Sequence, residues 1–317
     1  CLDANTTGNN QTGMGYNCLS NHTTGDNATG YGFSAGFTNT TGVITAIGSQ
    51  ALFSNQAGNN CTAVGVSALY NNTVSNNTAV GHSCMLSHTT GVQNVAMGAF
   101  AMDASTTARY TAAFGYHALG STTTADSNAA FGAYAAYLNT TGANLVAVGS
   151  NSLYNNTTGS NNNAVGFQCL YNNTTGHSAV AMGYQAGRNQ TTALYSTFVG
   201  DRSAGNGVVT GDKNTGLGHY SLYAVTSGAQ NVAVGANTLD ANTTGADNTG
   251  VGYNALTANT TASNNTAIGS SALASNTTGT SCTAVGQVAG TSNTTGSITA
   301  IGKSSLLLNT TGTSNTA

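Results

Sequence analysis

One motif, close to Thr-Ala-Val-Gly-x-x-Ala-Leu-x-x-Asn-Thr-Thr-Gly, recurs along the whole chain of 317 residues. Its first glycine follows an apolar residue and can be traced eighteen times, with a spacing of 17 residues that changes to 16 or 18 only four times. A period this short and regular is typical of a chain that winds one coil per repeat. We call these residues the repeat glycines: Gly15, Gly32, Gly48, Gly65, Gly81, Gly98, Gly115, Gly132, Gly149, Gly166, Gly183, Gly200, Gly218, Gly235, Gly252, Gly269, Gly286 and Gly302.

Each repeat joins two short apolar segments through turn residues. A large apolar residue precedes the repeat glycine, and a leucine usually follows it by four positions, as in Leu52 and Leu119. Asn-Thr-Thr-Gly favours turns, and Thr, Asn and Gly are poor helix formers. The sequence therefore predicts an all-β fold, a β-solenoid (parallel β-helix or β-roll) with about 18 coils. We expect a single repetitive domain over residues 1–317, an elongated rod uncapped at both ends.

Small and large residues alternate within each predicted strand, which leaves two packing modes open. If the large residues point inward, each coil encloses a core of Val and Leu and the protein could be monomeric. If alanine points inward, a continuous apolar stripe lies outside. Such a stripe exceeds the few hundred Å² that a monomer usually exposes, so it would have to be covered in an oligomer.

Two segments carry a resemblance to known proteins. The segment 163–176 reads NAVGFQCLYNNTTG and the segment 232–245 reads VAVGANTLDANTTG. These blocks resemble repeats of tail-fibre-type proteins. They are also similar to the shorter repeats of trimeric autotransporter (YadA-like) adhesin heads, from which they differ by their longer period of 17 residues. The resemblance covers nearly the whole chain. It implies a fibrous, surface-exposed, trimeric β-roll located outside the cell or on the surface of a cell or virion.

Composition narrows the function classes. Charged residues make up 4% of the chain and the net charge is −3, which gives no electrostatic footprint for nucleic acid. No apolar run is long enough to span a membrane. The six histidines and eight aspartates show no catalytic or metal-binding spacing, so we expect no enzyme, no cofactor and no metal site.

Asparagine-linked glycans are a candidate modification, because the chain contains 20 Asn-x-Ser/Thr sequons. The alternative is that Asn-Thr-Thr is a preferred solenoid turn in which asparagines stack as a ladder. The representative candidates are Asn5, Asn21, Asn39, Asn71, Asn139, Asn155, Asn172, Asn242, Asn259, Asn276, Asn293 and Asn309.

Two further features suggest contacts between coils. Cys1 and Cys18 are one repeat apart, close enough for a disulfide, although the cysteines also fit as small buried thiols in alanine positions. Tyr137, Tyr154 and Tyr171 lie in consecutive repeats and are predicted to stack as an aromatic ladder. The ladder could bind sugars or a neighbouring copy, or simply stabilise the solenoid.

The repeat from Gly200 to Gly218 gains one residue and collects Asp201, Arg202, Asp212 and Lys213, with His219 next to it. A surface bulge with ion pairs explains this cluster as well as an active site does.

These observations predict a structural subunit of an extracellular fibre or filament, built by trimerisation or by head-to-tail stacking and either bare or glycan-coated. The alternative is an adhesin or phage tail-fibre shaft that binds host or surface glycans. Ice binding through the threonine pairs is a remote alternative, since those pairs lie in turns.

Overall fold

The computed structural model describes residues 1–317, which form a parallel β-solenoid that contains no helix. The predicted all-β solenoid of about 18 coils with a 17-residue period is confirmed. The chain divides into two compact units, Cys1–Gly159 and Ser160–Ala317, and each is described by itself. The single domain over residues 1–317 stays a prediction.

Every coil contributes one short strand. In the first unit the strands are β1 (Thr12–Met14), β2 (Thr29–Tyr31), β3 (Ile44–Ile47), β4 (Cys61–Val64), β5 (Thr78–Val80), β6 (Val95–Met97), β7 (Ala112–Phe114), β8 (Ala129–Phe131) and β9 (Val146–Val148). In the second unit they are β10 (Asn163–Val165), β11 (Val180–Met182), β12 (Thr197–Val199), β13 (Thr215–Leu217), β14 (Val232–Val234), β15 (Thr249–Val251), β16 (Thr266–Ile268), β17 (Thr283–Val285), β18 (Ile298–Ile301) and β19 (Asn315–Thr316).

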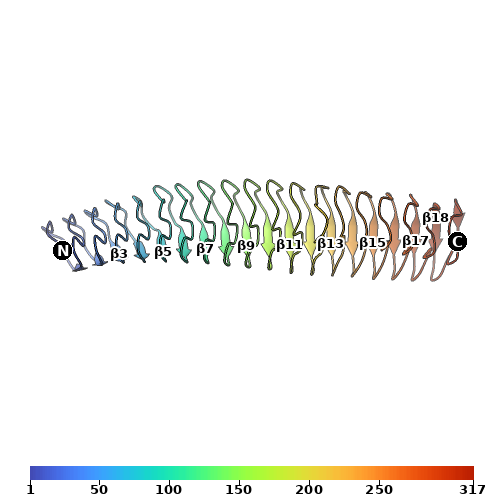
Figure 1. Cartoon of the computed structure of the whole chain (residues 1–317), viewed down its shortest axis with the longest axis horizontal. Coiled ribbons are helices and arrows are strands. Elements are labelled where there is room, and N and C mark those ends of the chain that lie inside the picture. Colours follow the sequence, from blue (N-terminus) through green and yellow to red (C-terminus); the bar gives the residue numbers. More distant parts are fainter. The chain divides into compact units, whose positions relative to one another are not determined.

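Within each unit, every strand pairs in parallel with the strand of the next coil (Figure 1). The register matches equivalent positions of consecutive repeats, so that Ala96 pairs with Ala113 and Ala113 with Ala130. Each position of the repeat therefore becomes a row of stacked side chains along the unit. Because neighbouring strands lie about 4.8 Å apart, the rows have that spacing.

The repeat glycine ends each strand at a close contact between coils. Gly115 has φ +141°, a conformation that L side chains rarely adopt. A β-carbon there would also overlap the backbone carbonyl of Gly132 in the next coil. The same relation holds from coil to coil within each unit, so this position requires glycine on both grounds.

The turn after the glycine uses left-handed conformations at residues other than glycine. His117 has φ +53° and Leu119 has φ +54°, which costs roughly 1–2 kcal/mol per residue. Hydrogen bonds between coils offset this cost: His117 N donates to Ala99 O at 3.1 Å, and Leu119 N donates to Ala135 O at 2.9 Å.

The burial of individual side chains shows which of the two packing modes the coils adopt. The central strand alanines, such as Ala96 and Ala113, are fully buried. Except in the last coil, the small residues three positions after the repeat glycine and the leucines four positions after it are also buried. The large residues that precede the glycine point outward, as Met97 and Phe131 show. Of the two packing modes, the structure has alanine inside and the apolar stripe outside, with leucine completing the core.

In three coils the position usually occupied by leucine is glycine, and a side chain from another position of the repeat fills the space. Glycine replaces leucine at Gly36, Gly187 and Gly290. At Gly187, a β-carbon would meet Leu170 and the ring of Phe198, each at 2.9 Å. Phe198 stands in the alanine row and is fully buried, so the missing leucine and the added phenylalanine compensate for one another.

We predict that Phe198→Ala leaves a cavity and destabilises the second unit by about 3 kcal/mol. Adding Gly187→Leu is expected to recover most of this loss, because Leu is tolerated at this φ in other coils, such as Leu170 (φ 50°). Urea denaturation of the wild type and both variants provides the test. Equal midpoints for the single and double variants would contradict the compensation.

Candidate functional site: the outward face of the strands

The outward side chains of the strands form two parallel rows on each unit, which we call the sheet face. The first row contains residues three positions before the repeat glycines, and the second row contains residues one position before them. In the first unit the first row is Thr12, Thr29, Thr45, Thr62, Thr78, Val95, Ala112, Ala129 and Val146, and the second row is Met14, Tyr31, Ile47, Val64, Val80, Met97, Phe114, Phe131 and Val148.

The second unit continues the same pattern on its own strands. Its first row is Asn163, Val180, Thr197, Thr215, Val232, Thr249, Thr266, Thr283 and Thr299. Its second row is Val165, Met182, Val199, Leu217, Val234, Val251, Ile268, Val285 and Ile301.

The sheet face is uncharged, with a second row of apolar and aromatic residues beside a first row rich in threonine. Met97 and Met182 are 48% and 50% exposed, and Phe131 and Ile268 are both 41% exposed. All five Lys and Arg residues and all eight aspartates lie outside the two rows. A contiguous exposed apolar row of this kind is typical of an interaction surface.

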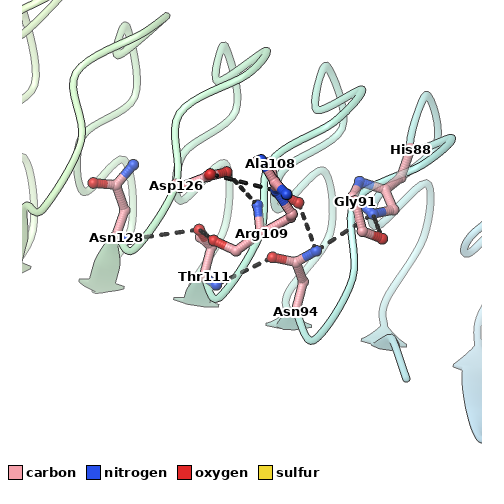
Figure 2. Close-up of polar contacts among 8 residues, drawn as sticks. All are labelled: His88, Gly91, Asn94, Ala108, Arg109, Thr111, Asp126 and Asn128. Carbon is pink, nitrogen blue, oxygen red and sulfur yellow. Dashed lines mark hydrogen bonds and ion pairs between the residues drawn. The ribbon is translucent and has the colours of Figure 1, made fainter. Parts of the chain in front are cut away.

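Buried asparagines hold the coils behind this face in register. Figure 2 shows Asn94, Thr111 and Asn128 in consecutive coils of the first unit. Asn94 Oδ1 accepts from Thr111 N at 3.1 Å, and its Nδ2 donates to Ala108 O at 2.8 Å. Thr111 Oγ1 accepts from Asn128 N at 3.5 Å. The second unit repeats the arrangement, with Asn231 N donating to Asn214 Oδ1 at 3.0 Å.

A second interior row contains the asparagines of the Asn-Thr-Thr-Gly turns. Asn259 Nδ2 donates to Ala262 O at 3.1 Å within its own turn and to Asn242 Oδ1 of the neighbouring coil at 3.0 Å. The first threonine of the pair also bonds between coils, as when Thr243 Oγ1 donates to Thr260 O at 3.0 Å. These turns therefore belong to the interior as much as to the surface.

This placement separates the sequon candidates into two groups. Asn39, Asn139, Asn242, Asn259, Asn276 and Asn293 are fully buried. In all of these except Asn39, Nδ2, the atom that would carry a sugar, donates to the carbonyl three residues later. A glycan at these positions requires the turn to open. The remaining candidates, which are exposed or half-buried, are Asn5, Asn21, Asn71, Asn155, Asn172 and Asn309.

The cysteines are free thiols. Cys1 is exposed and directs its Sγ to the Gly15 carbonyl, whereas Cys18 is fully buried. The Cys1–Cys18 disulfide is not formed here and stays a prediction. Cys61 and Cys282 replace asparagine in the row of Figure 2, and each thiol donates to a carbonyl at 3.1 Å, much as Asn94 Nδ2 does.

The aromatic ladder of Tyr137, Tyr154 and Tyr171 stays a prediction as a whole, because these residues divide between the two units. The rings of Tyr137 and Tyr154 are 5.4 Å apart but tilted by 39°, so they touch without stacking. Tyr171 belongs to the other unit, where the Arg188 guanidinium lies 5.9 Å above its ring. True stacks occur elsewhere, as for Phe53 and Tyr70, which lie 5.0 Å apart and nearly parallel. Stacked rings cover one another's faces, which are the surfaces that bind sugars.

The cluster at the longer repeat is partly assembled. His219 Nε2 lies 3.9 Å from Asp201 Oδ2, and both side chains are about half exposed. Arg202 Nη1 donates to the Tyr220 hydroxyl at 2.7 Å. Asp212 instead accepts from Leu194 N at 2.8 Å, in a turn. These contacts are those of a surface His–Asp pair beside tilted aromatic rings, with the Arg202 guanidinium 5.8 Å from the ring centroid of Tyr220.

The structure contains no pocket and no group of three or more His, Cys, Asp or Glu residues that could hold a metal ion. No helix long and apolar enough to cross a bilayer is present. Comparison with protein-family models, curated proteins and solved structures finds no match to this chain. The sheet face is therefore the strongest candidate for a functional surface.

Sequence reasoning identified the second row as a column but left its direction open, and it missed the first row altogether. The signal for the first row was its residue type, three positions before each repeat glycine. That residue is small or β-branched in nearly every repeat, as in Thr78 and Val95. Alternation on both sides of a central alanine is the pattern of a strand with one buried face.

We predict that one of the six thiols reacts rapidly with a disulfide reagent in the native protein. Burial raises the pKa of the Cys84 and Cys169 thiols to about 12 and also raises the pKa of the Cys18, Cys61 and Cys282 thiols, which keeps them unreactive. Only Cys1 is exposed. Two or more rapidly reacting thiols would contradict the structure, and none would indicate the Cys1–Cys18 disulfide.

We also predict a pH-dependent stability due to His88, which occupies an asparagine position of the interior row. Its Nε2 donates to Gly91 O at 2.8 Å (Figure 2), and its Nδ1 lies 3.2 Å from Ser105 Oγ. Burial lowers the pKa of His88 below its ordinary value of 6.5. The unfolded chain therefore takes up a proton first as the pH falls, so stability is full above pH 6.5 and decreases below it.

The matched variant is His88→Asn, which restores the usual residue of the row. Between pH 7.5 and 5.5 the wild type is expected to lose stability relative to this variant, by at most about 1.4 kcal/mol, the limit reached if folded His88 stays neutral. Denaturation curves at the two pH values provide the test. An identical pH dependence for both proteins would refute the assignment.

Proposed function

We propose that this chain is a structural subunit that assembles with copies of itself through the sheet face to build an extracellular fibre. The observation that carries the proposal is the uncharged, exposed second row, which continues from coil to coil in each unit. The repeat supplies the same surface many times, as a fibre subunit requires.

The size of this surface supports association. In the first unit the second row alone presents nine apolar or aromatic side chains in consecutive coils, all exposed or half-buried. Monomers rarely expose contiguous apolar patches of more than a few hundred Å². A continuous row of this kind therefore favours burial against another surface.

The residue types on the sheet face indicate which partner it can bind. It lacks charges, so it has nothing to recognise nucleic acid or anionic ligands. Threonine, valine and large apolar residues fit another surface of the same composition. We therefore place the chain itself, rather than a glycan, as the partner of this face. A glycan coat at the accessible sequons remains compatible with the proposal.

The test is the mass of the native particle, with a charge placed on the face. We predict that the wild type sediments as a multiple of 31.4 kDa and that Met97→Lys shifts it toward a monomer. A buried unpaired charge weakens self-association by about 100-fold or more. The matched control is Thr107→Lys, on an exposed turn, which is expected to leave the assembly intact.

Circular dichroism and thermal melting check that both variants fold. A wild-type protein that stays monomeric at all accessible concentrations would overturn the proposal. The same measurement gives the number of copies, and so also tests the trimer that the family resemblance implies.

A further inference from the structure

Two neighbouring coils break the uniformity of the sheet face in the first unit. Their second-row residues, Phe114 and Phe131, stack with ring centroids 4.9 Å apart and planes 5° apart. The same two strands carry Ala112 and Ala129 in the first row, where the other coils of this unit carry Thr or Val. A two-ring ridge therefore stands beside a notch of the same length.

From this shape, we infer that a second copy of the chain packs on the sheet face of the first unit in parallel and in register. The inference rests on the proposed self-assembly and adds its direction, register and symmetry. The two copies are related by a two-fold axis that runs along the stack of coils. The Phe114–Phe131 ridge of each copy then lies over the Ala112–Ala129 notch of its partner.

The symmetry follows from the arrangement of the rows. A two-fold axis along the stack keeps the coils in the same order and exchanges the two rows, so the second row of one copy faces the first row of the other. A two-fold axis along the strands reverses the order of the coils and leaves second row facing second row. That arrangement sets the ridge against large residues, with no notch available.

The width of the face favours two copies over three. Packed sheets lie about 10 Å apart, so three sheets around a common axis would each lie about 5 Å from it and need a face roughly 17 Å wide. Strands β7 and β8 contain three residues, which span about 10 Å. Two copies packed face to face need no minimum width.

The first experiment exchanges the ridge and the notch. We predict that Ala112→Phe fills the notch and weakens dimerisation at least tenfold, because the introduced ring would then meet Phe114 of the partner copy. Adding Phe114→Ala is expected to restore wild-type association, because each introduced ring then lies over the introduced alanine of the other copy. Sedimentation equilibrium measures the dissociation constants, and thermal melting of each variant confirms folding.

A second experiment measures direction and register by pulsed electron–electron spin resonance. Spin labels are attached at Thr41→Cys or Thr141→Cys, exposed turn positions of the first unit, in a Cys1→Ser background. The two positions are six repeats apart, so about 29 Å separates them along the stack. In a parallel, in-register pair, the 41–41 and 141–141 distances between copies are equal, and both are shorter than the 41–141 distance.

The outcomes separate the two proposals. A monomeric wild type would remove the proposed function and this inference together. An oligomer in which the 41–141 distance is the shortest, or in which Ala112→Phe has no effect, would overturn the parallel register and leave self-assembly standing. A trimer would overturn the two-fold axis and the ridge-over-notch contact, and would leave self-assembly standing.

Discussion

Successive coils touch backbone to backbone at the repeat glycine, and the other regularities of each unit depend on this contact. Because a β-carbon there would overlap the next coil's carbonyl, as between Gly115 and Gly132, no other residue permits the stacking distance. The contact fixes which positions of consecutive repeats lie over one another. Side chains of one kind then form rows, and what each row does depends on whether it points inward or outward.

The inward and outward rows differ in what their side chains do. Inside, the asparagine amide both donates and accepts, so a row such as Asn242 and Asn259 satisfies turn carbonyls and links the coils. This explains why a sequence so rich in sequons places many of them where a glycan cannot attach to the folded protein. Outside, the large residue that precedes each repeat glycine stays on the surface, because alternation along the strand turns it away from the buried central residue.

Much of the fold could be predicted from the sequence, because the period, the turn residues and the poor helix formers all indicate the same architecture. The direction of the strand side chains could not, since Val80 and Ala79 are both plausible core residues. The burial in the folded chain decides it: Ala79 and Leu69 are fully buried, whereas Val80 is half-buried on the outer side of its strand. The tilt between Tyr137 and Tyr154 was equally unpredictable, because it depends on neighbours from other rows, including Tyr134.

A perfectly periodic face can bind another copy of itself, but it cannot specify where. Every shift by one coil, about 4.8 Å, would bring equivalent rows together again with nearly the same energy. Register can therefore come only from positions that depart from the repeat, and on the sheet face of the first unit the largest departure is the pairing of Phe114 and Phe131 with Ala112 and Ala129. The repeat supplies the affinity for another copy, and its irregular coils determine the geometry of the complex.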